Sequence, residues 1–509
     1  MLTHALLSLL IWGSILGGII ALAIGHQPEN ANRARYMALF TAIASLLLCI
    51  PLLTGFNTHD FSMQFKEHWD WLPSLGISYS LGVDGISLAM ILLTCFTTLL
   101  VVMASWTSVK TKVAQYMAAF LIMQGFMIGV FAALDAILFY LFWEAMLVPM
   151  YLIIGIWGSD NRFYASIKFF LYTFFGSALF LAALLYLGSQ AHNFDLLGFY
   201  PLHLSLLTQQ LIFFAFLLAF AVKVPMWPVH TWLPDAHTEA PAGGSVVLAA
   251  IMLKMGAYGF LRFTLPIVPD ASRSLDWLMI ALSLVAIVYI GFVALAQIDM
   301  KKLIAYSSIA HMGFVTLGSF MIFGIVNRTH NLADAYMSLD GAIIQMISHG
   351  FGSAALFLCV GVLYERLHTR RISDYGGVVN SMPIFAVFFM IFALSNAGLP
   401  GTSGFVGEFM VVLSSFQSNF WIAALASTTL LLGAAYTLYM YKRVIFGDVA
   451  NSSIVELTDI NYLDRTVFIL ISAMIIFIGV YPAPLLQLLH TSVAHLLDLS
   501  LQSKVVGFS

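Results

Sequence analysis

The chain has 509 residues, of which 61% are hydrophobic and only 9% are charged. A soluble protein carries about 25% charged residues, so 21 Lys and Arg with 24 Asp and Glu are too few to cover a soluble protein of this length. A net charge of −3 provides no basic surface for nucleic acid. The isolated cysteines Cys49, Cys95 and Cys359 exclude a disulfide scaffold and a CxxC metal or redox site. The composition therefore indicates a polytopic membrane protein.

Apolar runs of about 20 residues recur along the whole chain, and each is long enough to cross a bilayer as a helix. Neither a basic region nor a small-residue cleavage site accompanies the first run, so we expect a permanent span there and not a signal peptide. The sequence predicts an all-α polytopic membrane protein with about fourteen transmembrane helices. The predicted spans are 2–24, 36–55, 84–107, 113–132, 135–157, 164–188, 207–237, 242–264, 275–296, 302–325, 340–364, 383–416, 420–446 and 465–488.

Two of the predicted spans, 207–237 and 383–416, are too long for a single crossing and contain helix-breaking residues. The first is interrupted at Pro225–Pro228 and the second at Gly398–Gly401. Proline removes a backbone donor and glycine loosens a helix. We therefore expect each run to form two half-helices joined by an unwound stretch.

The broken spans are the seventh and the twelfth, which places them five spans apart. Because five is odd, a tandem repeat of a five-helix unit would insert its second copy inverted relative to the first. Inverted repeats with broken helices at matching positions are typical of transporters. The predicted organisation is three N-terminal spans (1–112), a first five-helix repeat (113–264), a second inverted repeat (265–446), and a C-terminal span and tail (447–509).

Lysines and arginines in the loops predict the orientation of the chain, because they concentrate on the cytoplasmic side. With the N-terminus outside, twelve of them lie in loops that face the cytoplasm and five lie on the other side. This asymmetry predicts that both termini are outside. The twelve are Arg33, Arg35, Lys110, Lys112, Arg162, Lys301, Lys302, Arg366, Arg370, Arg371, Lys442 and Arg443, and the five are Lys66, Arg262, Arg273, Arg328 and Lys504.

Ionisable side chains inside predicted spans are the main functional signal, because one at the bilayer centre costs at least about 2.5–3.5 kcal/mol. Such a side chain needs a partner, water or a function. Their distribution over both repeats predicts a path for protons or cations through the membrane. The six candidate residues are Glu144, Lys223, Lys254, His311, His349 and Glu408.

Most of these residues also have a structural interpretation. Glu144 and Lys223 could form a static ion pair that only sets helix register, and Glu408 could cap the half-helix after its break, since a carboxylate suits a helix N-terminus. A histidine on an apolar helix is often a hydrogen-bonded core residue. Lys254 has no acidic partner at its depth, which makes a structural role hard to sustain. Asp84, Asp135 and Asp235 lie at span edges and are expected to stay solvated, and Lys168 and Arg465 are expected to snorkel.

Glu144 and Lys223 together could act as a switch. When Glu144 withdraws, the unbalanced charge of Lys223 disfavours a protonated Lys254. At about 8 Å and an effective dielectric of about 20 this repulsion is about 2 kcal/mol, whereas a potential of about 180 mV opposes each charge with about 4 kcal/mol. The remaining energy must come from a partner. The sequence has no Walker A loop, GxGxxG turn or His-rich cluster, so we expect this chain to bind no cofactor itself.

Three stretches of the sequence are specific enough to indicate a family: LFYLFWEAM at Leu138–Met146, KVPMWPVHTWLPDAHTEAP at Lys223–Pro241 and LPGTSGFVGEF at Leu399–Phe409. They closely resemble the antiporter-like subunits of the proton-pumping NADH:quinone oxidoreductase, respiratory complex I. The third resembles the M type, the counterpart of mitochondrial subunit 4, which has a glutamate where sister subunits have a lysine. Here that glutamate is Glu408. The resemblance extends over essentially the whole chain.

The resemblance implies that Glu144 and Lys223 form the switch pair, that Lys254 is the central proton carrier, and that His311 and His349 connect the two halves. It also implies that flavin, iron–sulfur clusters and quinone are held by partner subunits. This chain would translocate protons beside other antiporter-like subunits and lipids in the bacterial cytoplasmic (inner) membrane, with both termini on the periplasmic side.

Two other functions remain compatible with the sequence. One is a subunit of a multi-subunit cation/proton antiporter of the Mrp type, and the other is the membrane arm of a membrane-bound hydrogenase. The carboxylate at Glu408 favours the oxidoreductase, because a lysine is expected there in the antiporter. A purely structural scaffold is disfavoured by Lys254.

Overall fold

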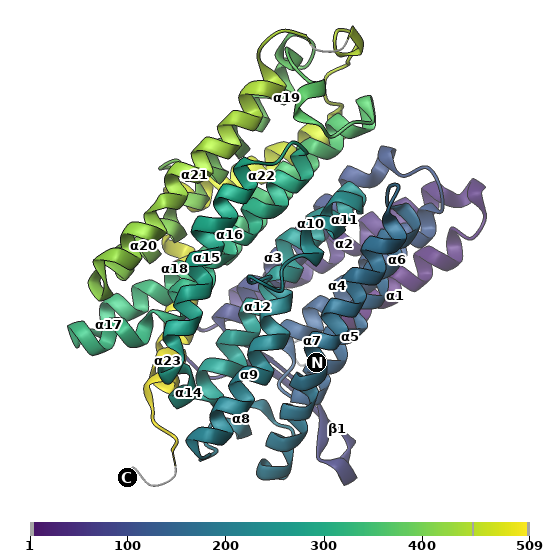
Figure 1. Ribbon diagram of the computed structural model, residues 1–509. Helices are drawn as coiled ribbons and strands as arrows, with labels where there is room; N and C mark the ends of the chain where they lie inside the picture. Colours follow the sequence, from purple (N-terminus) through teal and green to yellow (C-terminus); the bar gives the residue numbers. More distant parts are fainter. Residues whose placement is uncertain (1–4, 450–451, 506–509) are drawn as a thin grey trace.

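The computed structural model describes residues 5–449 and 452–505 (Figure 1). Within these residues, thirteen helices are long and apolar enough to cross a membrane. They match every predicted span except the twelfth, whose two halves are each too short. The structure thus confirms an all-α polytopic membrane protein. Positions 2–4 of the first predicted span and 506–509 of the predicted tail lie outside the described residues.

The N-terminal part contains three long helices and a β-hairpin that was not predicted. The two strands pair antiparallel, and the chain turns between them at Gly76, whose φ of 68° suits glycine. Glu67 of the hairpin is buried and accepts a 2.8 Å hydrogen bond from the backbone amide of Leu7, which ties down the start of α1. Figure 1 shows β1 at one end of the bundle. The elements are α1 (Leu6–Ile24), α2 (Ala31–Gly55), β1 (Gln64–Leu72), β2 (Ile77–Val83) and α3 (Gly85–Ser108).

The first predicted break lies among the helices that follow. α9 ends at Lys223 and α10 begins at Trp232, so the chain is unwound between them. The indole of Trp232 donates to the carbonyl of Val222 at 2.8 Å, which folds the unwound stretch back onto the end of α9. The elements are α4 (Val113–Ala132), α5 (Ala136–Ala145), α6 (Leu147–Trp157), α7 (Arg162–Ala191), α8 (Leu196–Phe199), α9 (Leu206–Lys223), α10 (Trp232–Glu239), α11 (Ala242–Val247), α12 (Leu253–Gly259) and α13 (Leu265–Ile267).

The second predicted break is also present. α19 ends at Asn396 and α20 begins at Ser403, and between them Gly398 and Gly401 have φ values of 74° and 92°, a backbone that glycine adopts without strain. The elements are α14 (Pro269–Ser274), α15 (Asp276–Leu295), α16 (Met300–Phe320), α17 (Ile322–Thr329), α18 (Leu332–Leu367), α19 (Pro383–Asn396), α20 (Ser403–Ser418), α21 (Phe420–Ile445), α22 (Tyr462–Val480) and α23 (Ala483–Leu501). Single-turn 3₁₀ helices lie at Pro28–Asn30, Pro73–Leu75, Ile372–Asp374, Val378–Asn380 and Ser452–Ile454.

The helix α18 is the longest in the described chain and connects the two halves of the molecule. It packs against α16 and α20 of its own half, against α11 of the first half and against α3 of the N-terminal part. The half-helix α10 also joins the halves, because it packs against both α7 and α16. The apolar part of α18 is buried on all sides. A helix enclosed in this way can hold polar groups away from lipid, so its polar residues are candidates for function.

Several predictions about the edges of spans were wrong. Arg262 and Lys301, assigned to loops, lie inside helices and are buried, and Asp84 pairs with Arg262 instead of staying solvated. Asp135, also expected to stay solvated, is fully buried and accepts hydrogen bonds from the backbone amides of Ser78 and Leu138. Asp235, in contrast, stays partly exposed while it pairs with Lys168 at 2.7 Å. The C-terminal tail after the last predicted span contains most of α23. α18 begins eight residues before the predicted start at 340, and with α17 it makes most of the loop predicted between 325 and 340 helical. A few polar residues at the end of a helix lower the mean hydropathy of the sequence window around them, so the helix end is mistaken for a loop.

Candidate functional site

The proposed switch pair lies where α5 faces the end of α9. Glu144 on α5 accepts a hydrogen bond from the hydroxyl of Ser177. Lys223, the last residue of α9, is 2% exposed, and its Nζ lies 4.6 Å from the centroid of the Trp143 ring. Among the described residues, Lys223 Nζ has no hydrogen-bond partner, and no ion pair joins it to Glu144 within 4.0 Å. A cation–π contact with Trp143 thus replaces the expected ion pair.

Lys254 lies on a helix whose regular backbone pattern is interrupted twice. π-helical turns at Leu248–Met252 and Phe260–Thr264 flank α12, and such turns are frequent at functional sites. The Lys254 side chain is fully buried; its Nζ donates to the carbonyl of Ala249 at 2.6 Å and lies 2.6 Å from Nδ1 of His349. Its side-chain partner is therefore a histidine of α18. A protonated Lys254 can only donate, so beside it a neutral His349 accepts at Nδ1 and carries its ring proton on Nε2.

The second half brings His311 of α16 and Glu408 of α20 together. His311 Nδ1 lies 2.6 Å from Glu408 Oε1, and the amide of Gln345 donates to the same oxygen at 2.9 Å. Glu408 is 2% exposed and lies beyond the first turn of α20, which begins at Ser403. Within the described chain, its hydrogen bonds come from α16 and α18 and not from the backbone amides of α20. The geometry therefore does not fit the capping interpretation.

A pair of histidines joins the two halves. The ring centroids of His311 and His349 lie 5.7 Å apart. Since His349 also contacts Lys254 and His311 contacts Glu408, four of the six predicted residues form one buried row, which we call the central row. Glu144 and Lys223 lie outside this row. No hydrogen bond of the described residues joins Lys223 to Lys254, although α9 packs against α12.

One buried histidine beside the central row was not predicted. His237 of α10 stacks on Phe357 of α18, with ring centroids 4.4 Å apart and planes 8° apart. In the part of the chain that the structure describes, neither ring nitrogen of His237 has a hydrogen-bond partner. Because the predicted span 207–237 ends at His237, the sequence did not distinguish this histidine from one that lies in solvent at the end of the span. Its position inside the stretch Lys223–Pro241 was the signal that could have found it.

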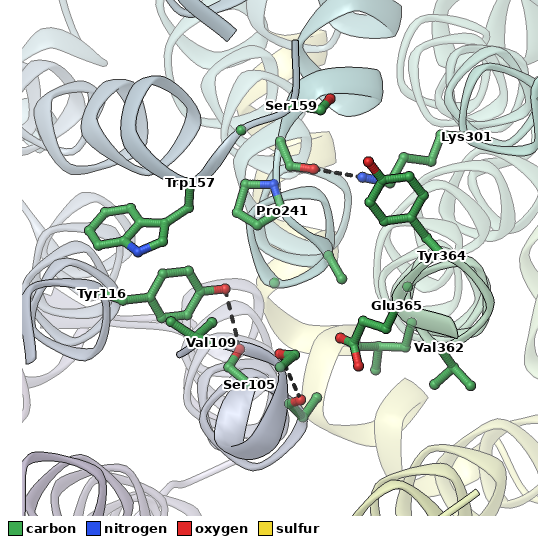
Figure 2. A pocket seen from close by; sticks show the side chains of 18 of the residues that line it. Ser105, Val109, Tyr116, Trp157, Ser159, Pro241, Lys301, Val362, Tyr364 and Glu365 are labelled. Atoms are coloured by element: carbon green, nitrogen blue, oxygen red, sulfur yellow. Dashed lines mark hydrogen bonds between the residues drawn. The ribbon is translucent and has the colours of Figure 1, made fainter. Parts of the chain in front are cut away.

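A cavity of about 260 Å³ lies on the face formed by the loops after α3, α6 and α18, which are loops of the more basic set (Figure 2). Figure 2 shows Tyr116 on one side of it and Lys301 and Glu365 on the other. Lys301 Nζ donates to the carbonyl of Ala240 at 2.6 Å. Ala240 directly follows α10, so the cavity places charged groups next to the half-helix that carries His237.

A buried ion pair holds the start of α3 against the helix that carries Lys254. Arg262 pairs with Asp84 and also donates to the hydroxyl of Ser87 at 3.2 Å. Asp84 caps α3, since its carboxylate accepts from the backbone amide of Ser87 at 2.9 Å. Each charge is satisfied by the other, so the pair has a structural role.

Replacing Asp84 by asparagine is expected to destabilise the fold by about 3–5 kcal/mol, because Arg262 keeps its charge in a buried site without its partner. Asparagine still caps α3, so the cap itself is retained. Urea unfolding of the detergent-solubilised protein measures the change. The double variant Asp84→Asn with Arg262→Met removes the unpaired charge and should recover most of the loss. Equal stability of Asp84→Asn and the parent would contradict a structural role for the pair.

Two family models match the chain. One, described as NADH:quinone oxidoreductase/Mrp antiporter, TM, matches residues 132–433, which is more than half of the chain. The other, described as NADH-ubiquinone oxidoreductase chain 4, amino terminus, matches residues 30–132. The chain belongs to the NADH:quinone oxidoreductase/Mrp antiporter family. The whole central row, from Lys254 to Glu408, lies within the part that this family model matches.

Similar proteins support the same assignment. NADH-quinone oxidoreductase subunit M of Rhodobacter capsulatus is 50% identical over 487 residues, with 93% of this chain and 92% of that protein covered. NADH-ubiquinone oxidoreductase chain 4 of Marchantia polymorpha is 42% identical and covers 97% of both chains. A chain of respiratory complex I from Thermus thermophilus with bound NADH has a TM-score of 0.86 at 29% identity, with 97% of this chain and 99% of that chain covered. These findings confirm the family that the sequence motifs indicate.

The antiporter branch of the family is more distant in sequence. A chain of the Mrp complex from Dietzia sp. DQ12-45-1b has a TM-score of 0.80 but is 20% identical, and the match covers all of this chain and 54% of that one. Identity at this level shows a shared fold and carries no further argument. Within the family, this chain is therefore more similar in sequence to these oxidoreductase subunits than to this Mrp chain.

Proposed function

We propose that this chain is the proton-translocating M-type membrane subunit of an NADH:quinone oxidoreductase. Electron transfer from NADH to quinone takes place in other subunits, and this chain moves protons through the central row. The observation that carries the proposal is the row itself, in which a buried lysine, two histidines and a glutamate follow one another across both halves. The similarity to subunit M supports the oxidoreductase over the Mrp antiporter.

Each contact in the central row suits one proton transfer. Lys254 Nζ is 2.6 Å from Nδ1 of His349, so a proton accepted there can leave the ring from Nε2, which has no partner among the described residues. The 5.7 Å between the two ring centroids requires a ring rotation or one bridging water for the next transfer. His311 then delivers the proton to Glu408 across 2.6 Å.

Glu144 and Lys223 act on this row through their charges. In this structure Ser177 donates to Glu144, and Lys223 Nζ lies over the ring of Trp143 without a hydrogen-bond partner among the described residues. The positive charge of Lys223 is then free to repel a proton from Lys254. For an assumed separation of about 8 Å and an effective dielectric of about 20, this repulsion is about 2 kcal/mol, less than the roughly 4 kcal/mol that a potential of about 180 mV demands per charge. The rest of the energy comes from partner subunits, which hold the flavin, iron–sulfur clusters and quinone.

The proposal also sets the place of the chain in the membrane. Residues 113–264 and 265–446 form the two inverted five-helix repeats, each with one broken helix. When the buried residues Lys301, Arg262 and Lys504 are left out, eleven basic residues remain on one side and three on the other. This ratio favours both termini on the periplasmic side of a bacterial inner membrane. The apolar outer faces of α1, α7 and α21 suit lipid and the neighbouring antiporter-like subunits.

Glutamine in place of Glu144 is expected to lower proton uptake and NADH:quinone turnover together, by about tenfold or more. The neutral amide can still bond Ser177 but exerts no charge on Lys223, and a charge interaction of about 2 kcal/mol corresponds to a factor of about 30. Proton uptake and turnover are measured in membrane vesicles that contain the assembled complex. Glu144→Asp keeps the negative charge on a shorter side chain and should lower both rates less than Glu144→Gln does. Wild-type rates in Glu144→Gln would show that the pair has no role in transport.

A further inference from the structure

A second cavity lies at the opposite end of α18 from the cavity in Figure 2. Its volume is about 710 Å³, and it is lined by Tyr336 and Asp340 from the first part of α18, Met410 from α20 and His490 from α23. Its other wall includes His59, from the segment between α2 and the β-hairpin. The cavity in Figure 2 is lined by the last turns of α18 instead. One membrane-crossing helix therefore carries a polar cavity at each end.

Asp340 is the one carboxylate among the described residues that line this second cavity. It lies eight residues into α18, which is about 12 Å along the helix from its start. The side chain is 7% exposed, and its Oδ1 has no hydrogen-bond partner among the described residues. A carboxylate in this position needs water or a second function, because no protein group satisfies it. The cavity is large enough to hold several waters.

Asp340 is also close to the end of the central row. Gln345, which donates to Glu408, lies five residues further along α18, a rise of about 7.5 Å. Directly beside Asp340, Gly341 allows a close approach of α18 to α20, since a Cβ there would lie 2.8 Å from the Cβ of Met410. Met410 follows Glu408 by two residues and also lines the cavity. The same short segment of α20 thus carries both the last residue of the row and a wall of the cavity.

We propose that Asp340 exchanges protons between Glu408 and this cavity, and so connects the central row to the face opposite the basic loops. Protonated Glu408 loses its proton and becomes a carboxylate, while the Asp340 carboxylate becomes an acid. Asp340 then releases the proton to water in the cavity, where Tyr336 and His490 offer further polar groups. The role of Asp340 rests on the proposed function of the central row, whereas its access to water from one face does not.

The accessibility of position 340 is tested first, with a cysteine there and a membrane-impermeant methanethiosulfonate reagent. The three native cysteines are buried, so they contribute little background. In the assembled complex, Asp340→Cys should react when the reagent is on the face opposite the basic loops, and Ala342→Cys, which is fully buried two residues away, should not. Absence of reaction at position 340, or reaction only from the basic face, would overturn the proposal.

Proton transfer is tested by activity in the same vesicles. Asp340→Asn should lower proton uptake and NADH:quinone turnover about tenfold, Asp340→Glu should restore most of both, and Asp334→Asn should behave as wild type. Asp334 is a matched control because it lies in the first turn of the same helix and outside the cavity. Rescue by glutamate, with equal amounts of assembled complex, separates a proton-exchanging role from a structural one.

Lys254→Ala in the same assay separates the two proposals. If Lys254→Ala is inactive and Asp340→Asn is normal, the proposal for Asp340 fails and the proposed function stands. If Lys254→Ala pumps normally, the proposed function fails, and the labelling result still decides whether Asp340 faces water. If Asp340→Asn does not assemble, labelling of Asp340→Cys in assembled complex decides alone.

Discussion

Replacement of Lys254 by alanine is expected to abolish most proton pumping and, because the two processes are coupled, most NADH:quinone turnover. The variant removes the side chain whose Nζ lies 2.6 Å from His349 Nδ1, and alanine can neither hold nor release a proton. A loss of at least tenfold is expected, which corresponds to about 1.4 kcal/mol in the activation free energy. Proton uptake and turnover in vesicles measure both effects.

A second variant separates the effect of losing the proton-carrying group from the effect of losing the packing of a buried side chain. Lys254 is fully buried, so alanine also leaves a cavity of the kind that costs about 2–5 kcal/mol in a core. Lys254→Met keeps most of the volume and should assemble normally while remaining inactive. Lys302→Ala, near the start of α16, controls for the loss of a lysine elsewhere and should be active. Normal pumping by assembled Lys254→Met would refute the role of Lys254 as the central carrier.

Glutamine at position 408 is expected to lower pumping about tenfold or more, whereas lysine at the same position should retain more of it. A proton carrier must ionise, and lysine can do so while glutamine cannot. The site can also accommodate an ammonium group, because the unpartnered Oε1 of Gln345 and Nδ1 of His311 can accept hydrogen bonds from it. The comparison uses proton uptake and NADH:quinone turnover at matched levels of assembled complex.

The opposite ranking of the two variants would exclude the carrier role of Glu408. Glutamine reproduces the shape of glutamate and its hydrogen bonds to Gln345, so it would perform better than lysine if the residue only held helices together. Since α16 and α18 supply the hydrogen bonds to Glu408, such a structural role would also lower the amount of assembled complex more for Glu408→Lys than for Glu408→Gln.

The parts of the fold that could be predicted are those determined by residues close together in the sequence. Fourteen apolar runs predicted the spans, because the bilayer requires about 20 apolar residues for each crossing. The two breaks followed from Pro225–Pro228 and Gly398–Gly401, and both occur where expected. The β-hairpin was not predicted, since Gln64–Leu72 alternates weakly and contains four charged or histidine side chains, which made it resemble a loop.

The candidate site was predictable only where a charge interrupts an apolar run. Lys254 and Glu408 stood out for that reason, and the central row contains both. Asp340 and Lys301 were missed because they fell at predicted span edges, where a buried charge and a solvated one give the same pattern. The partner of Lys254 could not be predicted either, because His349 lies 95 residues away and meets it only through the packing of α18.

The two π-helical turns beside Lys254 also change which residues share a face of this helix. An ideal α-helix advances about 100° per residue, and each π turn inserts about one extra residue into that pattern. A helical wheel drawn from Ala242 at a constant angle therefore assigns the residues beyond Met252, and again those beyond Thr264, to the wrong face. Cysteine or tryptophan scans across this helix should thus show a periodicity that shifts phase twice, and a scan analysed with one uniform period would misassign the face that carries Lys254.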